Sequence, residues 1–247
     1  MGKIVAIGGG EIKDLETLAI DREIIKLTGK KHPRALFIPT ASNDAEGYWK
    51  TFQEIYGKKL GCKPYVLYLV REHPSRETIR QKIFSADLIY VGGGNTVKMH
   101  KIWKRHGVDK LLKRAQEEGT ILSGLSAGAV CWFRYGTSDF RRNAKNPRAP
   151  LSRISGLDFV HASVSPHHIR EKDRTPALKK MMKMTPGVAF AIDDNAALEI
   201  VDDGYRAISS KPGSKVHLVY YSRGKLHYEI LPQTKEFFPL EDILRKN

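Results

Sequence analysis

The chain has 247 residues and a mass of 27.9 kDa, and its 41% of apolar side chains is enough to bury a core. Apolar runs such as Leu88–Val91 and Val188–Ile192 are far shorter than the ~20 residues of a membrane-spanning helix. The N-terminus lacks the charged leader and apolar segment of a signal peptide. The two cysteines, Cys62 and Cys131, are too few for a disulfide framework, and no cluster has zinc-ligand spacing. We therefore expect a globular cytoplasmic protein without a bound metal.

The charge balance is strongly basic, with 42 lysines and arginines against 27 acidic residues and a formal net charge of +15. Such an excess invites a nucleic-acid interpretation. However, it is spread over Lys98–Arg114, Arg141–Arg148 and Arg170–Lys183, and no helix-turn-helix, zinc-finger or RNA-binding signature is present. We expect no nucleic-acid and no membrane partner. The charge fits attraction of a small acidic substrate, or solubility, better.

The first half of the chain alternates short β-rich runs with segments of helical spacing, which is typical of a mostly parallel sheet with helices on both faces. The expected strands are Lys3–Ile7, Ala35–Ile38, Tyr65–Val70, Leu88–Val91 and Ile121–Gly124. The expected helices are Asp14–Leu27, Gly47–Leu60, Ser75–Phe84, Thr96–Arg105 and Val108–Glu118. Asn95 is placed to cap the fourth of these helices.

The second half is richer in strands. Phe140–Leu151 is basic and aperiodic and is predicted to be a long surface loop, a kind of segment that is often functional. The expected strands are Phe159–Val164, Val188–Ile192, Leu198–Val201, Tyr205–Ile208, Val216–Tyr221 and Leu226–Ile230. Turn signals between the last four predict a C-terminal β meander over about residues 196–231. We expect one α/β domain spanning residues 1–247.

Glycines follow several of the predicted parallel strands, at whose carboxyl ends the site of an open α/β sheet lies. Gly8-Gly9-Gly10 resembles a dinucleotide loop, but it lacks the G-x-G-x-x-G spacing, and Glu11 would repel phosphate. A close approach between this backbone and a neighbouring loop is the preferred explanation.

Gly124-Leu125-Ser126-Ala127-Gly128 fits the pattern G-x-S-x-G between an apolar strand and a helix expected to begin near Ala129. In that context the serine lies on a sharp turn with its hydroxyl exposed. The Ala127 amide is then placed to donate to an oxyanion. An ordinary tight turn is the alternative, and the strand–turn–helix context favours Ser126 as a nucleophile.

A serine nucleophile needs a base and a carboxylate that orients that base. Among the nine histidines, His167 and His168 are distinctive, because Ser165-Pro166 ends an apolar strand and presents them at its tip. Spacing does not choose among the candidate carboxylates. They are Asp139, Asp158, Asp193 and Asp194.

Several motifs occur together and in the same order as in a known family. They are Ile7–Gly10, Phe37–Ser42, Val91–Thr96, Gly124–Ala129, Cys131–Phe133, Ser138-Asp139, Ser165–His167 and Ala191–Leu198. The combination resembles the dipeptidase E (aspartyl dipeptidase) family of serine peptidases, whose relatives include cyanophycinase. The resemblance covers roughly residues 3–205. It implies a fold similar to class I glutamine amidotransferases, with a serine at the nucleophile position.

Carried over by position, the resemblance implies that Ser126 is the nucleophile, His167 the general base and Asp139 the residue that orients His167. The Gly94 amide would join the Ala127 amide in the oxyanion hole. No metal or organic cofactor is implied.

The family prefers aspartate before the scissile bond, and an arginine is the usual partner of such a carboxylate. Arg141, Arg142 and Arg170 are the candidates. The expected function is a serine peptidase, monomeric or homodimeric, that hydrolyses dipeptides or short peptides with an acidic N-terminal residue through an acyl-enzyme. The alternatives are a hydrolase of the same mechanism acting on isoaspartyl or cyanophycin-like peptides or on other amides or esters, and a non-catalytic binding module.

Overall fold

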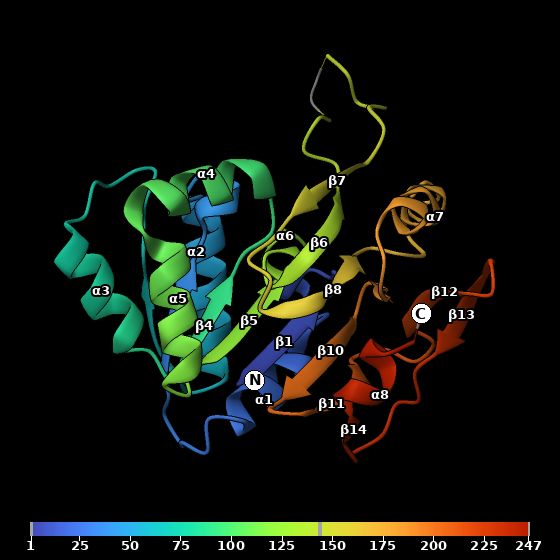
Figure 1. Cartoon of the computed structure of the whole chain (residues 1–247). Helices are drawn as coiled ribbons and strands as arrows, with labels where there is room; N and C mark the ends of the chain where they lie inside the picture. The colour runs from blue at the N-terminus through green and yellow to red at the C-terminus, as the bar shows by residue number, and fades with distance from the viewer. Residues whose placement is uncertain (1, 143–144, 247) are drawn as a thin grey trace.

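A computed structural model describes residues 2–142 and 145–246 and contains two β-sheets with helices packed around them (Figure 1). The larger sheet has eight strands in the order β14-β11-β10-β1-β5-β4-β2-β3. These strands are β1 (Lys3–Ile7), β2 (Arg34–Ile38), β3 (Lys63–Val66), β4 (Leu88–Val91), β5 (Ile121–Leu125), β10 (Ala196–Val201), β11 (Gly204–Ser209) and β14 (Phe238–Pro239). The first five along the chain are mutually parallel, whereas β10, β11 and β14 extend the sheet with antiparallel pairs.

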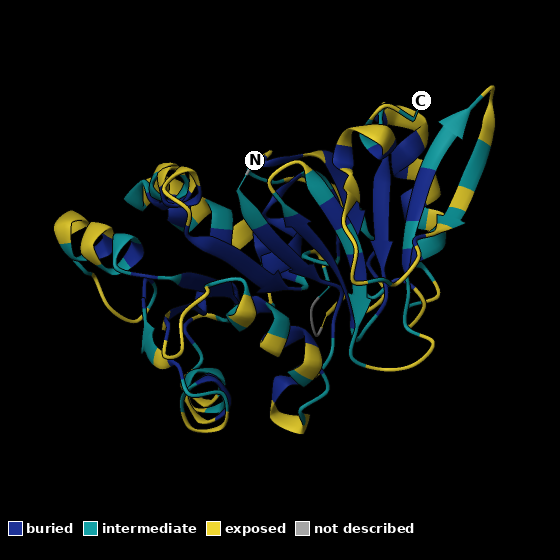
Figure 2. Cartoon of the chain, turned by 90° about the horizontal axis from the view of Figure 1, so that it is seen from below, coloured by how far each residue is buried: buried dark blue, intermediate teal, exposed yellow. Residues whose placement is uncertain are grey.

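Helices cover both faces of the parallel part, because its strands are apolar on both sides. On β1, Val5 and Ile7 pack into one cluster with helical side chains, and Ile4 and Ala6 pack into the opposite cluster. One face is covered by α1 (Leu18–Lys26) and α2 (Glu46–Phe52), with a π-helical continuation over Gln53–Lys59. The other is covered by α3 (Arg76–Phe84), α4 (Thr96–His106) and α5 (Val108–Glu117). Figure 2 shows the resulting pattern of buried strands and outward-facing exposed helical residues.

The smaller sheet has six strands in the order β13-β12-β9-β8-β6-β7. They are β6 (Phe133–Ser138), β7 (Ser152–Ser155), β8 (Val160–Ser165), β9 (Ala189–Ile192), β12 (Val216–Ser222) and β13 (Lys225–Ile230). The remaining helices are α6 (Ala127–Val130), α7 (Arg174–Met184) and α8 (Leu240–Leu244). Leu178 and Met181 of α7 pack on Ala189 and Val219 of this sheet. Phe190 and other side chains of the small sheet share an apolar cluster with the large one, so the two sheets are packed together.

The mixed α/β class with helices on both faces is confirmed, but the predicted C-terminal meander is wrong. β10 and β11 form a hairpin in the large sheet, where Leu198 pairs with Ala6 of β1. β12 and β13 form a second hairpin in the small sheet, where Val216 pairs with Ile192 of β9. Turn signals identify each local hairpin. Long-range packing, however, determines with which other strand each hairpin pairs.

Two boundaries also differ from expectation, each for a local reason. The third strand ends at Val66, because the Asp44 carboxylate accepts the backbone amides of Leu69, Val70 and Arg71 at 2.7, 2.5 and 3.0 Å. The helix after Ser126 begins at Ala127 and ends at Val130, and the buried strand β6 follows it. Strands β6 and β7 and helix α7 were not predicted. The long loop between β6 and β7 is present, although residues 143–144 lie outside the described part.

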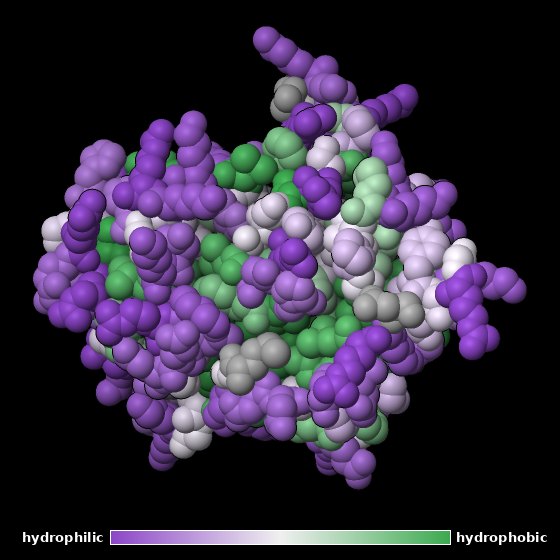
Figure 3. All heavy atoms as spheres, in the orientation of Figure 1, coloured by the Kyte–Doolittle hydropathy of each residue, from purple (hydrophilic) through white to green (hydrophobic). Residues whose placement is uncertain are grey.

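Hydrophilic side chains cover most of the surface over α3, α4 and α5 on the face that Figure 3 shows. The expected helix pair within Lys98–Arg114 is present as α4 and α5, with Met99, Trp103 and Leu112 buried beneath it. Among the described residues, no helix is both long and apolar enough to cross a bilayer.

Candidate active site

Ser126 lies on a sharp turn between β5 and α6. Its backbone has φ 55° and ψ −108°, an unfavourable conformation for a residue with a Cβ. The flanking glycines permit this turn: a Cβ on Gly124 would lie 2.3 Å from the Gly128 carbonyl oxygen, and one on Gly128 would lie 2.1 Å from the Val91 carbonyl oxygen. The expected strand–turn–helix geometry is therefore present, and small residues are required on both sides of the serine.

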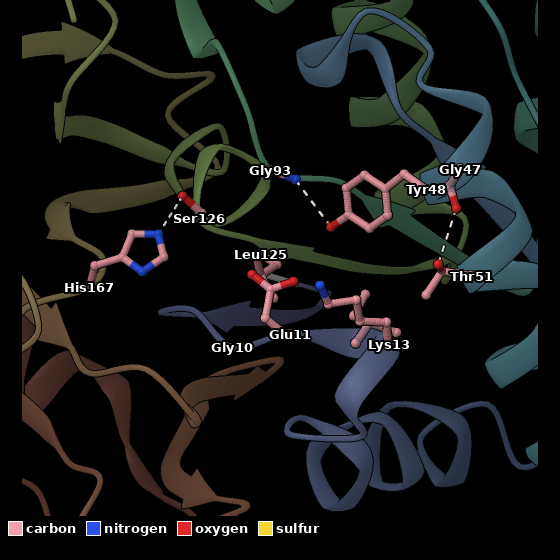
Figure 4. Close-up of a pocket in the computed structure, with 11 residues that line it drawn as sticks. Gly10, Glu11, Lys13, Gly47, Tyr48, Thr51, Gly93, Leu125, Ser126 and His167 are labelled. Carbon is pink, nitrogen blue, oxygen red and sulfur yellow. Dashed lines mark hydrogen bonds between the residues drawn. The ribbon is translucent and has the colours of Figure 1, made fainter. Parts of the chain in front are cut away.

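His167 meets Ser126 from the other sheet. It follows β8, and its Nε2 lies 2.8 Å from the Ser126 Oγ (Figure 4). Its backbone also has a positive φ, 52°, which turns the ring away from the direction of the strand. The neighbouring His168 is buried and lies beside His217 and Tyr228, away from Ser126. Of the two adjacent histidines, His167 is the one that the structure joins to the serine.

The carboxylate beside His167 belongs to Asp194. Its Oδ1 lies 2.5 Å from the His167 Nδ1, and its Oδ2 accepts a 3.1 Å hydrogen bond from Arg170. Burial alone would raise the pKa of Asp194, but the hydrogen bonds and charges of His167 and Arg170 lower this pKa below its usual value. A carboxylate that stays ionised is suited to orient an imidazole and to stabilise its cation.

The expected pairing of Asp139 with His167 is not found. Asp139 follows β6, and its carbonyl oxygen accepts the amide of Arg142 at 2.7 Å. Asp194 was one of the carboxylates that spacing left open. The available sequence signal was that Asp194 closely follows the predicted strand Val188–Ile192, as His167 follows Phe159–Val164. In the structure these strands, β9 and β8, are adjacent and parallel, with Ser165 opposite Ala191, so the residues just after them lie at one edge of the sheet.

Three consecutive carbonyl groups at the end of β1 and just after it connect the segments of the site through main-chain hydrogen bonds. The Ile7 carbonyl accepts the amide of Ser126 at 3.0 Å, the Gly8 carbonyl accepts that of His167 at 3.2 Å, and the Gly9 carbonyl accepts that of Asn195 at 2.9 Å. Gly8 and Gly9 lie so close to neighbouring segments that neither has room for a side chain. A Cβ on Gly8 would lie 2.2 Å from the Asp193 carbonyl oxygen, and one on Gly9 would lie 1.9 Å from Asp194 Oδ1. The close approach expected of this loop is confirmed.

A cavity of about 510 Å³ opens in front of Ser126 and His167. Its wall includes charged, aromatic and backbone groups from the segments that follow β1, β2, β4 and β5 of the large sheet, together with His167 after β8 of the small sheet (Figure 4). They are Gly10, Glu11, Ile12, Lys13, Gly47, Tyr48, Thr51, Gly93, Leu125, Ser126 and His167.

Two backbone amides lie near Ser126, and one of them, that of Gly93, belongs to a residue that lines the cavity. Ala127 is the first residue of α6, so its amide has no partner within the helix. Gly93 lines the cavity, and its amide donates a 3.4 Å hydrogen bond to the Tyr48 hydroxyl. Gly94, the residue expected here, instead packs against backbone, since a Cβ on it would lie 2.3 Å from the Ala41 carbonyl oxygen. The structure therefore places Gly93, rather than Gly94, at the cavity.

None of the three arginines expected to hold a substrate carboxylate is among the described residues that line this cavity. Arg142 is bonded to Asp173 and to the Ala149 carbonyl. Arg141 lies over the Phe140 ring, 5.5 Å from its centroid. Arg170 is bonded to Asp194, with its side chain 64% exposed. Lys13 is the cation on the wall. Within the described ranges, no three histidine, cysteine or acidic side chains are grouped to hold a metal ion.

Fold and site together define a peptidase of the serine type. The chain belongs to peptidase family S51, whose model matches residues 4–208. It is 33% identical over 237 residues to the uncharacterized peptidase YgaJ of Bacillus subtilis strain 168, covering 94% of this chain and 98% of that one. It is 26% identical over 205 residues to peptidase E of Shewanella denitrificans, covering 79% of this chain and 83% of that one. The fold is similar to that of a peptidase from an acI-B1 actinobacterium, with a TM-score of 0.72, 22% identity and 97% coverage of each chain.

Proposed function

We propose that this S51 peptidase hydrolyses short peptides through an acyl-enzyme on Ser126. The observation that carries the proposal is the hydrogen-bond chain from Ser126 Oγ through His167 to Asp194, placed at the cavity wall. A serine hydroxyl is a poor nucleophile until a base removes its proton, and an ionised carboxylate stabilises the resulting imidazolium.

In this mechanism the Ser126 Oγ attacks the scissile carbonyl carbon while its proton passes to His167 Nε2. The amides of Ala127 and Gly93 donate to the oxyanion of the tetrahedral intermediate. The C–N bond then breaks, and His167 gives its proton to the leaving amine. In the second half, His167 takes a proton from water, the hydroxide adds to the ester carbon, and the C–Oγ bond breaks as His167 returns that proton to the Ser126 Oγ.

For the substrate, we propose a peptide whose N-terminal residue is acidic, with Lys13 as the cation that meets its side chain. Lys13 takes this role in place of the three arginines because it lines the cavity. The relative named peptidase E supports a peptide substrate. Isoaspartyl or other amide substrates would use the same catalytic groups and differ only at the cavity wall.

The experiment is a comparison of wild type with Ser126→Ala on a dipeptide panel that contains Asp-Leu and Asn-Leu, together with labelling by a fluorophosphonate. Wild type should be labelled on Ser126 and should cleave Asp-Leu about tenfold to a hundredfold better than Asn-Leu, as expected for a charge-assisted contact. Ser126→Ala should lose the label and at least ~10³-fold in kcat. Unchanged turnover by Ser126→Ala would reject the mechanism, and equal rates on the two peptides would reject only the acidic preference.

A further inference from the structure

Glu11 is a carboxylate on the wall of the catalytic cavity that the hydrolytic mechanism does not use. It follows Gly10, and Figure 4 shows its side chain extending into the cavity between His167 and Lys13. Among the described residues, no lysine or arginine nitrogen lies within 4.0 Å of it as a salt-bridge partner. An exposed carboxylate facing a reactive serine is available to a cation that arrives with the substrate.

The backbone that carries Glu11 is held in place independently of its side chain. The Glu11 amide donates a 2.8 Å hydrogen bond to Glu16 Oε2, and Lys211 binds the other oxygen of Glu16 at 2.5 Å. Gly10, with φ 122°, turns the chain into this loop. The Glu11 carboxylate is thus presented on a fixed loop, as a binding group must be if it is to select a substrate.

The charge of Glu11 acts on Tyr48 of the cavity wall and on Arg170, which lies outside that wall. Burial raises the pKa of Tyr48 to about 12, and the negative charge of Glu11 adds to that increase. The hydrogen bond to Asp194 raises the pKa of Arg170, and Glu11 contributes to that increase as well. Both effects show that the Glu11 carboxylate lies close to the groups that surround Ser126.

We propose that Glu11 binds the free α-ammonium group of the substrate, so that the enzyme acts on unblocked peptide N-termini. This inference rests on the proposed function. When the first residue occupies the cavity with its carbonyl carbon at Ser126, its ammonium lies two bonds from the reacting carbon. Glu11 is an anion and Lys13 a cation, and they are separated by one residue on the same wall. An N-terminal aspartate carries an α-ammonium group that complements Glu11 and a side-chain carboxylate that complements Lys13.

The test compares aspartate p-nitroanilide with succinic acid mono-p-nitroanilide, which keeps the side-chain carboxylate and lacks only the ammonium. Wild type should prefer the aspartate compound about 10- to 100-fold in kcat/KM. Glu11→Gln should reduce that preference to nearly one, mainly through a higher KM for the aspartate compound. Asp14→Asn is the matched control: Asp14 is an exposed acid on the same turn that does not line the cavity, and its removal should keep the wild-type ratio.

Binding can be compared without turnover. Aspartate amide should protect Ser126 from a fluorophosphonate better than succinamate does, and Glu11→Gln should remove that difference. A wild-type ratio retained in Glu11→Gln, or equal protection by the two amides in wild type, would overturn the role of Glu11. Both results leave Ser126 labelled. Failure of the proposed mechanism is separate, since Ser126 would then resist the label, or Ser126→Ala would remain active, whatever residue stands at position 11.

A further variant, Lys13→Met, identifies which carboxylate of the substrate Lys13 meets. If it is the side chain of the first residue, Lys13→Met should lower turnover of Asp-Leu and spare Asn-Leu. If it is the C-terminus of a dipeptide, Lys13→Met should lower both and should have no effect on Asp-Leu amide. The first result supports acidic selection with Glu11 as its amine-binding counterpart. The second supports a dipeptide clamp that uses the same Glu11.

Discussion

Asp194 and His167 leave two adjacent parallel strands at the same edge of the small sheet, and their side chains meet there at 2.5 Å. The base and its carboxylate therefore belong to one sheet, while Ser126 comes from the other. The hydrogen bond between Ser126 and His167 spans the junction of the two sheets.

Asp194→Asn should lower kcat strongly, by about 10³- to 10⁴-fold, because an amide does not balance the imidazolium and can stabilise the wrong tautomer of His167. Asp139→Asn is the matched control, since Asp139 is an acid that does not contact His167, and it should stay within about threefold of wild type. The measurement is steady-state kcat with the secondary structure of each variant checked by circular dichroism. A large loss in Asp139→Asn with a normal Asp194→Asn would restore the assignment made from the resemblance.

Arg170 acts on the site through Asp194 and is a positioning residue. Removing its charge in Arg170→Gln should raise the pKa of Asp194 toward that of an ordinary buried carboxyl, because the hydrogen bond and charge of Arg170 contribute to the lowering. Since the Arg170 side chain is 64% exposed, we expect only about a three- to tenfold loss of kcat. The acid limb of the pH–kcat profile should move to higher pH. Arg170→Lys should restore part of both effects, and an unshifted limb would show that Arg170 has no electrostatic role.

Gly9→Ala should inactivate the enzyme by displacing Asp194 and His167. The added methyl would lie 1.9 Å from Asp194 Oδ1 and 2.4 Å from His167 Nδ1, and the carboxylate can move away only by leaving the imidazole. We expect at least a ~10²-fold loss of kcat with a small change of melting temperature. Gly8→Ala differs, because its methyl would meet the backbone of Ile192 and Asp193 and should lower the melting temperature instead. Comparable kcat values for Gly9→Ala and wild type would show that the loop can move aside.

The dependence of stability on pH should contain two opposing contributions between about pH 4 and pH 6.5. Burial raises the pKa of Asp21 to about 6, so the folded state binds more protons than the unfolded state there, and stability falls as pH rises. Burial, together with the charge of His217, lowers the pKa of His168 to about 4. The unfolded state then binds more protons, and stability rises with pH. His100, whose pKa burial also lowers to about 4, acts in the same direction as His168.

The two contributions can be separated by urea titrations at pH 4.5, 5.5 and 6.5. Asp21→Asn should make the free energy of unfolding increase more steeply with pH than in wild type, whereas His168→Asn should make it flatter. Each change should be on the order of 2–3 kcal/mol across the window. Slopes that move in the opposite directions would contradict the assigned ionisation states.

The parallel half of the fold and the serine turn were predictable because they depend on short-range patterns. Leu88–Val91 is apolar throughout and fully buried, and Gly124–Gly128 fits only a sharp strand-to-helix turn. Strand β6 was missed because its residues Arg134 to Ser138 do not alternate cleanly, and its burial comes from pairing with β8. The pairing of β10 with β1 and of β12 with β9 likewise depends on strands that are distant in the sequence.

The carboxylate and the cavity wall were less predictable from sequence. The resemblance favoured Asp139, which lies 13 residues beyond Ser126, whereas the strand order brings Asp194 to His167. The same is true of Arg142 and Arg170, whose charges are paired with neighbouring carboxylates in the folded chain. Glu11 was noted in the sequence as a residue hostile to phosphate, and only the fold places that negative charge in front of the serine.

The three successive carbonyls of Ile7, Gly8 and Gly9 bind the backbone of the segments that carry the nucleophile, the base and the carboxylate, so all three segments are fixed to the end of β1. Because these are main-chain acceptors, no side-chain substitution removes the acceptor atoms themselves, and the spacing of the nucleophile, base and acid changes only where a new side chain, as at Gly8 or Gly9, pushes the segments apart. The same arrangement makes loss of function cooperative: when β1 leaves the sheet, the amides of Ser126 and His167 lose their acceptors together. Under increasing denaturant, turnover should therefore disappear in step with hydrogen exchange at these two amides, with no partially active state in between.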